Sequence, residues 1–237
     1  MDIWSEPKID AHCHVLDPQR FAYHPDVSYR PAGQEIGSAD YFKQVLTCYG
    51  VRHALLVGPN SGYATDNRCL LDAIANSPAT YKGIAVVPND TNADTLQRLK
   101  EGGVIGVAFN PSLMGFDHYA NIEPLLKRLR ELDMWAQFQV ENNQLTDFLP
   151  MLARGRAGRA VVKLSGFAKF SREGFPFVDA RPVIDAMAQA FGLQQCVWAS
   201  DWPFLKAPYR LDYGPLLKIY EGMFTADERH QLLSLIH

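Results

Sequence analysis

The sequence lacks the features that mark membrane, secreted and nucleic-acid-binding proteins. No apolar run approaches the roughly 18 residues that a transmembrane helix requires. Residues 1–7 contain neither a basic region nor an apolar stretch, so no signal peptide is predicted and we expect a cytoplasmic protein. The formal net charge of -3 gives no basic footprint for nucleic acid. Neither a nucleic acid nor a membrane is therefore expected as a partner, and the sequence does not predict an oligomeric state.

Cysteine is scarce and poorly placed for metal or disulfide chemistry. The four cysteines (Cys13, Cys48, Cys69 and Cys196) are widely spaced and form no Cys-x-x-Cys pair. This spacing predicts buried free thiols in a reducing compartment. Repeats, linkers and low-complexity segments are missing as well. The 237 residues, 47% of them hydrophobic, suit one large domain or two small ones, and we predict a single barrel domain over residues 1–237.

What the sequence does contain is a nearly regular alternation of strand-like and helix-like segments. The predicted strands cover residues 8–15, 54–57, 83–87, 104–109, 135–140, 160–164 and 196–199. The predicted helices cover residues 38–50, 92–100, 122–132, 144–153 and 181–191, with one more from about residue 65 and another opened by the capping box Thr225–Glu228. Such alternation predicts the α/β class and a (β/α)8 TIM-like barrel, a parallel sheet covered by helices.

Seven predicted strands are one fewer than such a barrel needs. The sixth strand is the missing one, because a single helix and the segment Arg154–Arg159 separate the fifth strand from Ala160. Either the chain has an internal deletion there, or the printed sequence omits residues of the molecule. Omission is favoured, since a barrel without one strand has an open edge with unpaired backbone groups. A break is therefore expected between Arg154 and Arg159, with Cα atoms much farther apart than about 3.8 Å.

The most informative residues are His12 and His14, which lie two apart in an alternating strand pattern. Side chains two apart on a strand point to the same face, so both imidazoles project together near the carboxyl end of that strand. Asp201 follows the last predicted strand, at the corresponding end of a barrel. A carboxylate there is a metal ligand, a general base or a helix cap. Beside two histidines the catalytic interpretation is favoured.

Several motifs together resemble the amidohydrolase superfamily, in particular its 2-pyrone-4,6-dicarboxylate lactonase-like branch. They are Asp10-Ala-His12-Cys-His14-Val, Phe21-Ala-Tyr23-His-Pro25, Tyr29-Arg-Pro31, Gly103-Val-Ile-Gly-Val-Ala-Phe-Asn110 and Ala199-Ser-Asp201-Trp-Pro203. The resemblance covers nearly the whole chain. It implies a hydrolase of a small cyclic ester, with Asp201 as general base and His12 and His14 polarising the carbonyl. The family's sixth-strand motif, Asp-His-x-Gly-Arg-Pro, has no counterpart here, which coincides with the missing strand.

The resemblance also implies substrate-binding positions and a metal preference. Tyr29 matches a loop tyrosine, Lys169 falls where the branch has a carboxylate-binding arginine, and Gln139 falls where it has a tyrosine. Asn60, in the loop after the second strand, is the fourth predicted substrate contact. The branch is thought to need no metal. A single zinc or manganese ion on His12, His14 and Asp201 is the alternative, because residues 108–110 supply no bridging lysine or glutamate for a second ion.

Three interpretations stay open at this point. Lys163 lies inside an apolar strand, so it is either paired within the barrel or directed outward. The chain is either a lactone hydrolase or, if strand six is truly deleted, a non-catalytic binding protein or pseudoenzyme. A sugar-lactone isomerase is a close variant of the hydrolase.

Overall fold

The computed structural model describes residues 2–141, 144 and 160–234, and the chain divides into two compact units. Unit 1 comprises Met1–Arg20, Pro31–Leu56 and Ala160–His237, and unit 2 comprises Phe21–Arg30 and Val57–Arg159. The expected break between Arg154 and Arg159 lies outside the described residues, as does the predicted helix 144–153 beyond Gln144. The single-domain interpretation stays a prediction.

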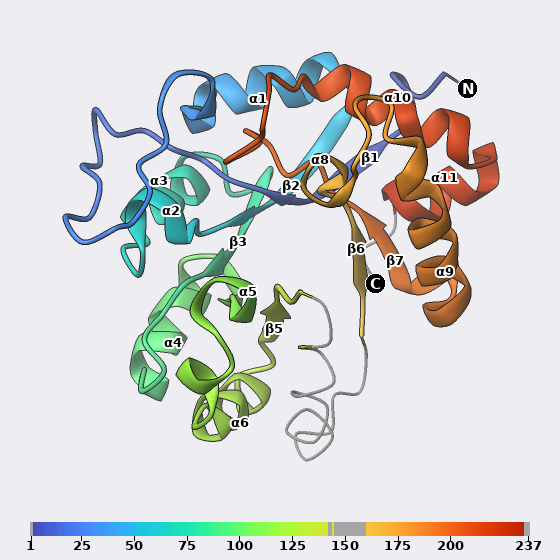
Figure 1. Cartoon of the computed structure of the whole chain (residues 1–237). Helices are drawn as coiled ribbons and strands as arrows, with labels where there is room; N and C mark the ends of the chain where they lie inside the picture. The colour runs from blue at the N-terminus through green and yellow to red at the C-terminus, as the bar shows by residue number, and fades with distance from the viewer. Residues whose placement is uncertain (1, 142–143, 145–159, 235–237) are drawn as a thin grey trace. The chain divides into compact units, whose positions relative to one another are not determined.

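Unit 1 contains two pairs of parallel strands (Figure 1). Strand β1 (Lys8–Cys13) pairs with β2 (Val51–Val57), and β6 (Val162–Leu164) pairs with β7 (Cys196–Trp198). The helices of this unit are α1 (Ala39–Cys48), α8 (Phe167–Phe170), α9 (Arg181–Phe191), α10 (Tyr213–Met223) and α11 (Ala226–Ser234). Short 3-10 turns occupy Gly33–Glu35, Val178–Ala180 and Leu193–Gln195.

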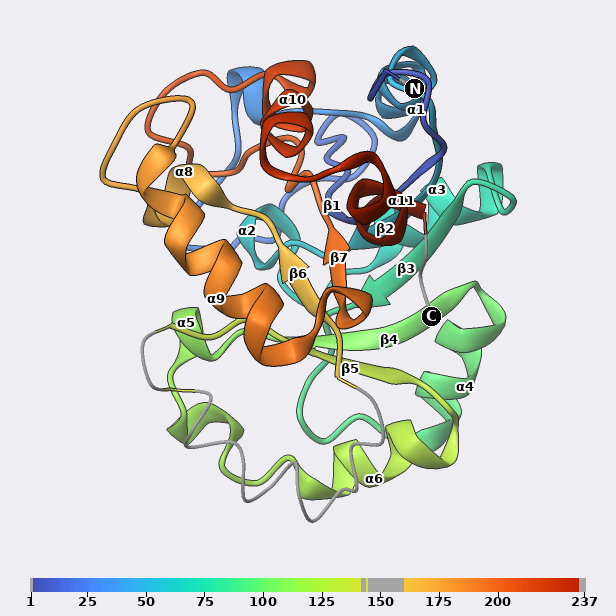
Figure 2. The ribbon, with the colours of Figure 1, turned by 90° about the vertical axis from the view of Figure 1, so that its right-hand side faces the viewer.

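Unit 2 is built on three parallel strands in the order β3 (Tyr81–Ala85), β4 (Val104–Phe109) and β5 (Trp135–Phe138), seen together in Figure 2. Helices α3 (Arg68–Asn76), α4 (Ala93–Glu101) and α6 (Glu123–Glu131) each pack against the strand that follows them in the chain. The remaining elements are α2 (Asn60–Tyr63), α5 (Pro111–Met114) and the 3-10 turn Asp117–Tyr119. Parallel strands joined through helices confirm the predicted α/β class.

Local capping explains why several helices begin where the sequence predicts. The Ser38 side chain accepts a hydrogen bond from the Tyr41 N–H at the start of α1, and Asn92 does the same for Thr95 in α4. At α11 the Thr225 N–H donates to the Glu228 carboxylate, while the Thr225 hydroxyl accepts from the Glu228 N–H. These bonds satisfy amide groups that a helix leaves unpaired in its first turn.

Helix α10 is an element that the sequence analysis did not predict. Gly214 and Gly222 lie inside it, and glycine lowers the propensity for a helix, while Pro215 falls in the first turn, where proline is tolerated. Burial overrides this low propensity, since Tyr213, Leu217 and Tyr220 are all almost completely buried. Among the helices of the described residues, none combines the length and hydropathy that a bilayer span needs.

The start of β1 is fixed by a buried group of charged side chains. Arg229 of α11 binds the Glu6 carboxylate, with Nη2 2.6 Å from Oε1, and donates from Nη1 to the Phe224 carbonyl. Lys8 is 1% exposed, and its ammonium donates to the carbonyls of Ile3 and Glu6. Pairing and hydrogen bonding offset the large cost of burying these charges.

Burial lowers the pKa of Lys8 to about 8, the nearby carboxylates of Glu6 and Asp2 opposing the shift. Between about pH 8 and the unfolded value of 10.5 the unfolded chain therefore carries a proton on Lys8 that the folded chain has lost. The free energy of unfolding then rises with pH across this window. We expect Lys8→Met to remove on the order of 1–2 kcal/mol of that rise between pH 7.5 and 9.5, measured by urea unfolding. Lys127→Met, at an exposed lysine, should keep the wild-type slope; equal slopes for all three proteins would contradict the prediction.

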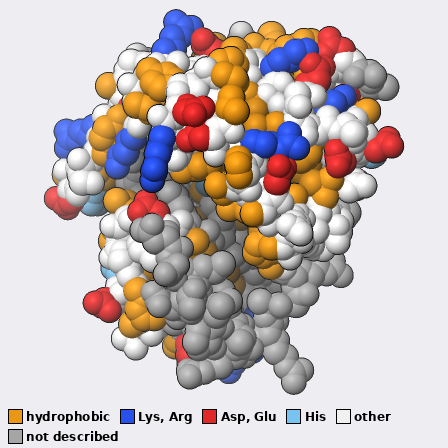
Figure 3. All heavy atoms as spheres, turned by 45° about the vertical axis from the view of Figure 1, so that its right-hand side comes forward, with side chains coloured by type: hydrophobic (Ala, Val, Ile, Leu, Met, Phe, Trp, Pro, Cys, Tyr) orange, Lys and Arg blue, Asp and Glu red, His pale blue; other side chains and the backbone are white. Residues whose placement is uncertain are grey.

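The outer face of α9 is partly apolar. Val183, Met187 and Phe191 follow one another at intervals of four, so they share one side of the helix, and each is more than a third exposed. Phe175 and Val178, just before the helix, are exposed as well. Figure 3 shows hydrophobic side chains between charged ones on the surface it faces.

Candidate active site

The two histidines of β1 lie together as the alternation predicts. His12 is the penultimate residue of β1, and His14 directly follows the strand. Their Nε2 atoms are 3.3 Å apart, and their rings meet edge to face with centroids 4.9 Å apart. Both side chains are largely buried, so two imidazole nitrogens face one small volume of unit 1.

Asp201 completes this group from the segment after β7. Its Oδ1 lies 3.7 Å from His12 Nε2 and 3.6 Å from His14 Nε2. Its backbone N–H donates to the His12 carbonyl at 2.8 Å, which joins the end of β1 to the turn after β7. The backbone of Asp201 has a φ of 62°, a left-handed conformation that is unfavourable for most residues other than glycine. The sequence prediction that His12, His14 and Asp201 converge is confirmed in the geometry, while their catalytic roles stay a prediction.

The left-handed turn at Asp201 is held by its neighbours. The Trp202 carbonyl accepts from the His14 N–H at 2.7 Å, and the Trp202 N–H donates to the Ser200 hydroxyl at 3.0 Å. The Trp202 ring stacks on Phe42 of α1, with centroids 4.2 Å apart and planes 11° from parallel. These contacts hold the backbone on both sides of Asp201 and so keep its carboxylate next to the two histidines.

Two lysines bring positive charge to the group. Lys169, at the end of α8, lies with Nζ 2.6 Å from Asp201 Oδ2, whereas the two histidines face the other carboxylate oxygen, Oδ1. Lys163 of β6 lies with Nζ 3.3 Å from His12 Nδ1. The open question about Lys163 is thereby answered, because its side chain is directed into the site. Its role could not be assigned from sequence, since a single lysine in an apolar strand fits either orientation.

Burial and charge together set the protonation states of the group. Burial alone would raise the pKa of Asp201, but the hydrogen bond with His14 and the charge of Lys169 outweigh it and hold that pKa well below its usual range. Burial, then the charge of Lys163, lowers the pKa of His12 well below its usual value. Burial also lowers the pKa of Lys163 to about 7. At neutral pH the site therefore presents an ionised Asp201 and an uncharged His12.

The three donors fit a single divalent metal ion. Ligand nitrogens of tetrahedral zinc, with Zn–N of about 2.0–2.1 Å, lie about 3.3 Å apart, which matches the separation of the two Nε2 atoms. The ligand atoms of His12, His14 and Asp201 all lie within 4.8 Å of one another. Two histidines and one carboxylate are also a usual donor set for catalytic zinc. The expectation that no metal is required is therefore not supported, and the three side chains are suited to hold one metal ion.

A small pocket opens beside Asp201 and Lys169. Its apolar walls come from α8, β7 and α10 and include the side chains of Phe167, Trp198 and Leu217. An apolar enclosure with a few charged groups at one end is the usual form of a small-molecule site. The site of unit 1 thus combines a carboxylate, two imidazoles and an ammonium group with a hydrophobic wall.

The other predicted substrate contacts belong to unit 2. The Tyr29 carbonyl accepts from the Gly62 N–H, and Asn60 Oδ1 accepts from Asn110 Nδ2 at 3.4 Å. Gln139, just after β5, is exposed, and its N–H donates to the Phe109 carbonyl. Their roles, like the substrate-binding role of Lys169, remain predictions.

Comparison with known sequences places the chain among amidohydrolases. The family model described as Amidohydrolase matches residues 9–235. A 2-pyrone-4,6-dicarboxylate hydrolase of Comamonas testosteroni is 33% identical over 108 residues, which are 43% of this chain but only 32% of that relative. A 4-sulfomuconolactone hydrolase of Rhizobium radiobacter is 26% identical over 265 residues, covering 94% of this chain and 86% of the relative. An alignment longer than the 237 residues of this chain means that this relative has residues within the aligned span that this chain lacks.

Comparison with solved structures gives the same fold. A probable 2-pyrone-4,6-dicarboxylic acid hydrolase from Acinetobacter baumannii, with citric acid bound, has a TM-score of 0.81 at 22% identity and covers 96% of each chain. An amidohydrolase from Burkholderia multivorans with bound zinc has a TM-score of 0.71 at 16% identity, again with 96% of each chain covered. The predicted TIM-like fold class is confirmed by these similarities.

Proposed function

The chain belongs to the amidohydrolase family of enzymes, and from this premise we propose that it hydrolyses a small lactone that carries a carboxylate. The observation that carries the proposal is the buried group in which the Asp201 carboxylate faces His12 and His14 on one side and Lys169 on the other. Two relatives are named as hydrolases of 2-pyrone-4,6-dicarboxylate and of 4-sulfomuconolactone, substrates with an acidic group. A cation beside the reactive carboxylate suits such a substrate.

The chemistry assigned to each residue follows from its position. Asp201 accepts a proton from water, whose oxygen attacks the ring carbonyl carbon. His12 and His14 face the same volume and stabilise the negative charge that develops on the carbonyl oxygen. The ring C–O ester bond then breaks, and the leaving oxygen takes up a proton to give a hydroxy acid. A divalent metal held by His12, His14 and Asp201 would supply Lewis-acid polarisation at this position.

Lys169 links substrate binding to the basicity of Asp201. In the structure its ammonium neutralises the Asp201 carboxylate and thereby weakens it as a base. A substrate carboxylate that binds Lys169 draws this charge away from Asp201. Substrates without a carboxylate lack that effect, so the pair favours carboxylated lactones in both binding and reaction.

The proposal is tested by assaying the wild-type protein against 2-pyrone-4,6-dicarboxylate, an aliphatic lactone with a carboxylate and the same lactone without one. Ring opening releases a proton, which a pH indicator follows, and adds the mass of one water to the product. The assay is run as purified, with a chelator, and with added zinc or manganese. Hydrolysis of the carboxylated lactones supports the proposal. Conversion without a mass change would indicate an isomerase, and no conversion under any of the metal conditions would refute the proposal.

Lys169→Met tests the recognition of the substrate carboxylate. Loss of one charge-assisted hydrogen bond should raise KM for a carboxylated lactone about tenfold or more, while KM for its uncharged analogue should change less than about twofold. Lys127→Met removes an exposed lysine of α6 and serves as the control, with both KM values unchanged. Equal KM changes for the two substrates in Lys169→Met would show that Lys169 does not bind the carboxylate.

A further inference from the structure

We infer that Asp10 is a positioning residue that holds the end of β1 and the turn after β7 together, and so sets Asp201 against His12 and His14. This role in turnover rests on the proposed function. The Asp10 side chain contacts no side chain that is assigned to the reaction. It binds the backbone N–H groups of His12 and Ser200 instead. It lies in β1, two residues before His12, and is 0% exposed.

The Asp10 carboxylate is bound from three separate parts of unit 1. Oδ1 accepts from the His12 N–H at 3.3 Å and from the Ser200 N–H at 2.9 Å. Oδ2 accepts from the Tyr213 hydroxyl at 2.9 Å. One oxygen therefore bridges the two backbone segments that carry His12 and Asp201, and the other is anchored by α10.

These contacts bear directly on the conformation of Asp201. Ser200, which Asp10 binds, immediately precedes Asp201, and the Asp201 N–H in turn binds the His12 carbonyl. A left-handed backbone at a residue other than glycine persists only where the surroundings hold it. The Asp10 carboxylate supplies part of that restraint, because it binds the backbone N–H groups of Ser200, which precedes Asp201, and of His12.

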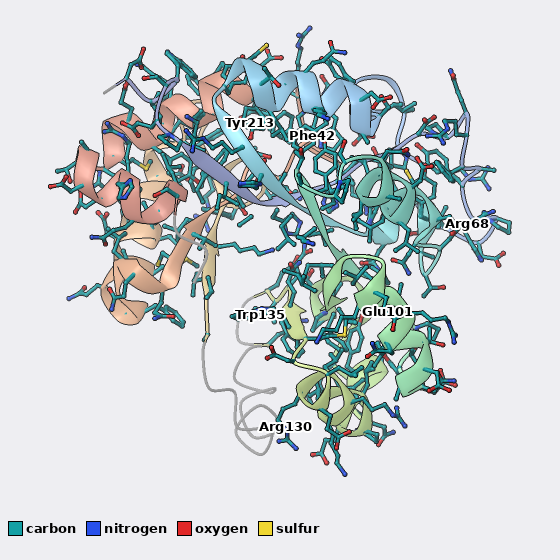
Figure 4. The ribbon with its side chains drawn as sticks, turned by 180° about the vertical axis from the view of Figure 1, so that it is seen from behind. Phe42, Arg68, Glu101, Arg130, Trp135 and Tyr213 are labelled. Carbon is teal, nitrogen blue, oxygen red and sulfur yellow. The ribbon has the colours of Figure 1, made fainter. Side chains whose placement is uncertain are left out.

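The Tyr213 hydroxyl is itself held in place by aromatic packing. Its ring stacks on Tyr49 with centroids 5.3 Å apart, meets Trp198 edge to face at 5.8 Å, and lies 6.3 Å from Phe42. Figure 4 shows the labelled side chains of Tyr213 and Phe42 near helix α1. A rigid donor on Oδ2 prevents the carboxylate from rotating away from the Ser200 and His12 amides.

A buried carboxylate with three donors would also stabilise the fold without affecting the reaction. Glu6 provides the matched comparison, because it is likewise a buried carboxylate near β1, but it binds Arg229 and lies before the strand rather than within it. A purely structural role predicts the same behaviour for Asp10 and Glu6. A positioning role predicts that only changes at Asp10 alter turnover.

The experiment compares Asp10→Asn, Tyr213→Phe and Glu6→Gln with the wild type by kcat, KM, urea unfolding and crystal structure. Asparagine keeps an acceptor for the backbone amides but loses the charge, so kcat should fall about tenfold, with KM changed less than about twofold. Tyr213→Phe frees Oδ2 and should lower kcat about threefold. Glu6→Gln should lower the urea midpoint and leave kcat unchanged. A wild-type kcat in folded Asp10→Asn, or an equal fall in Glu6→Gln, would overturn the inference.

The crystal structures separate this inference from the proposed function. If the wild type hydrolyses no lactone, the proposed function fails, but the position of Asp201 in Asp10→Asn still decides the inference. A displaced Asp201 carboxylate or a changed backbone φ at that residue supports the positioning role. An Asp201 that superposes on the wild type in both Asp10→Asn and Tyr213→Phe refutes it.

Discussion

Asp201→Asn should lower kcat for lactone hydrolysis by about 10²–10⁴-fold, the contribution of a positioned general base. Asparagine has nearly the same shape and tolerates the left-handed conformation that Asp201 adopts. The variant should therefore fold, and the hydrogen bond from residue 201 to the His12 carbonyl should persist. What it loses is the ability to accept a proton. Steady-state kinetics with circular dichroism as a folding check measure both effects.

Asp66→Asn is the control for this variant. Asp66 also forms a short ion pair, 2.7 Å from Arg68, but lies in unit 2 before α3. Its replacement removes a carboxylate that, like Asp201, is paired with a basic side chain. Asp66 is not part of the group formed by His12, His14 and Asp201, so kcat should not change. A turnover in Asp201→Asn equal to that of the wild type on every lactone accepted would remove Asp201 from the mechanism.

Gly37→Ala should reduce activity about 10²-fold and destabilise the fold by about 1–3 kcal/mol. A Cβ at residue 37 would lie 1.9 Å from Cη2 of the Trp202 ring. That ring cannot move aside cheaply, because it is buried and stacked on Phe42. The strain is therefore passed to the backbone next to Asp201, where a displacement near 1 Å is enough to impair the reaction.

The measurements for Gly37→Ala are kcat/KM and the urea midpoint. Gly174→Ala is the matched control, since a Cβ there meets nothing within 4 Å and neither property should change. A Gly37→Ala protein with wild-type activity and stability would show that the turn after β7 can yield without cost. Restoration of activity by a second change, Phe42→Leu, would show that the stacked ring transmits the strain.

The sequence was sufficient to predict those parts of the site that depend on local periodicity. His12 and His14 follow from alternation along one strand, and Asp201 follows from its position after a short apolar strand. Asp10 lies two residues before His12, but nothing in the sequence distinguishes it from an ordinary strand carboxylate. Its meaning comes from Ser200 and Tyr213, which are 190 and 203 positions away in the chain. Contacts at such separations leave no local pattern.

The backbone of the turn after β7 was also beyond sequence reasoning. Asp201, Phe204 and Lys206 all have positive φ, although none is glycine. Propensity favours glycine, asparagine or aspartate at such positions, so Phe204 and Lys206 are the exceptions. The conformations are set instead by tertiary contacts, among them the bond from the Lys206 N–H to the buried Glu35 carboxylate. Local preference and final structure therefore disagree in the segment that carries the reactive carboxylate, as is common at functional sites.

The way the chain is divided between its two units has a consequence for how such enzymes diversify. The reactive group draws on Met1–Arg20 and Ala160–His237, whereas Asn60 and Gln139 lie in the uninterrupted stretch Val57–Arg159. Two crossovers between related genes, one at each border of that stretch, would exchange two of the four predicted substrate contacts and leave every reactive side chain inherited from one parent. Chimeras joined at these borders are therefore natural starting points for directed evolution of the substrate range.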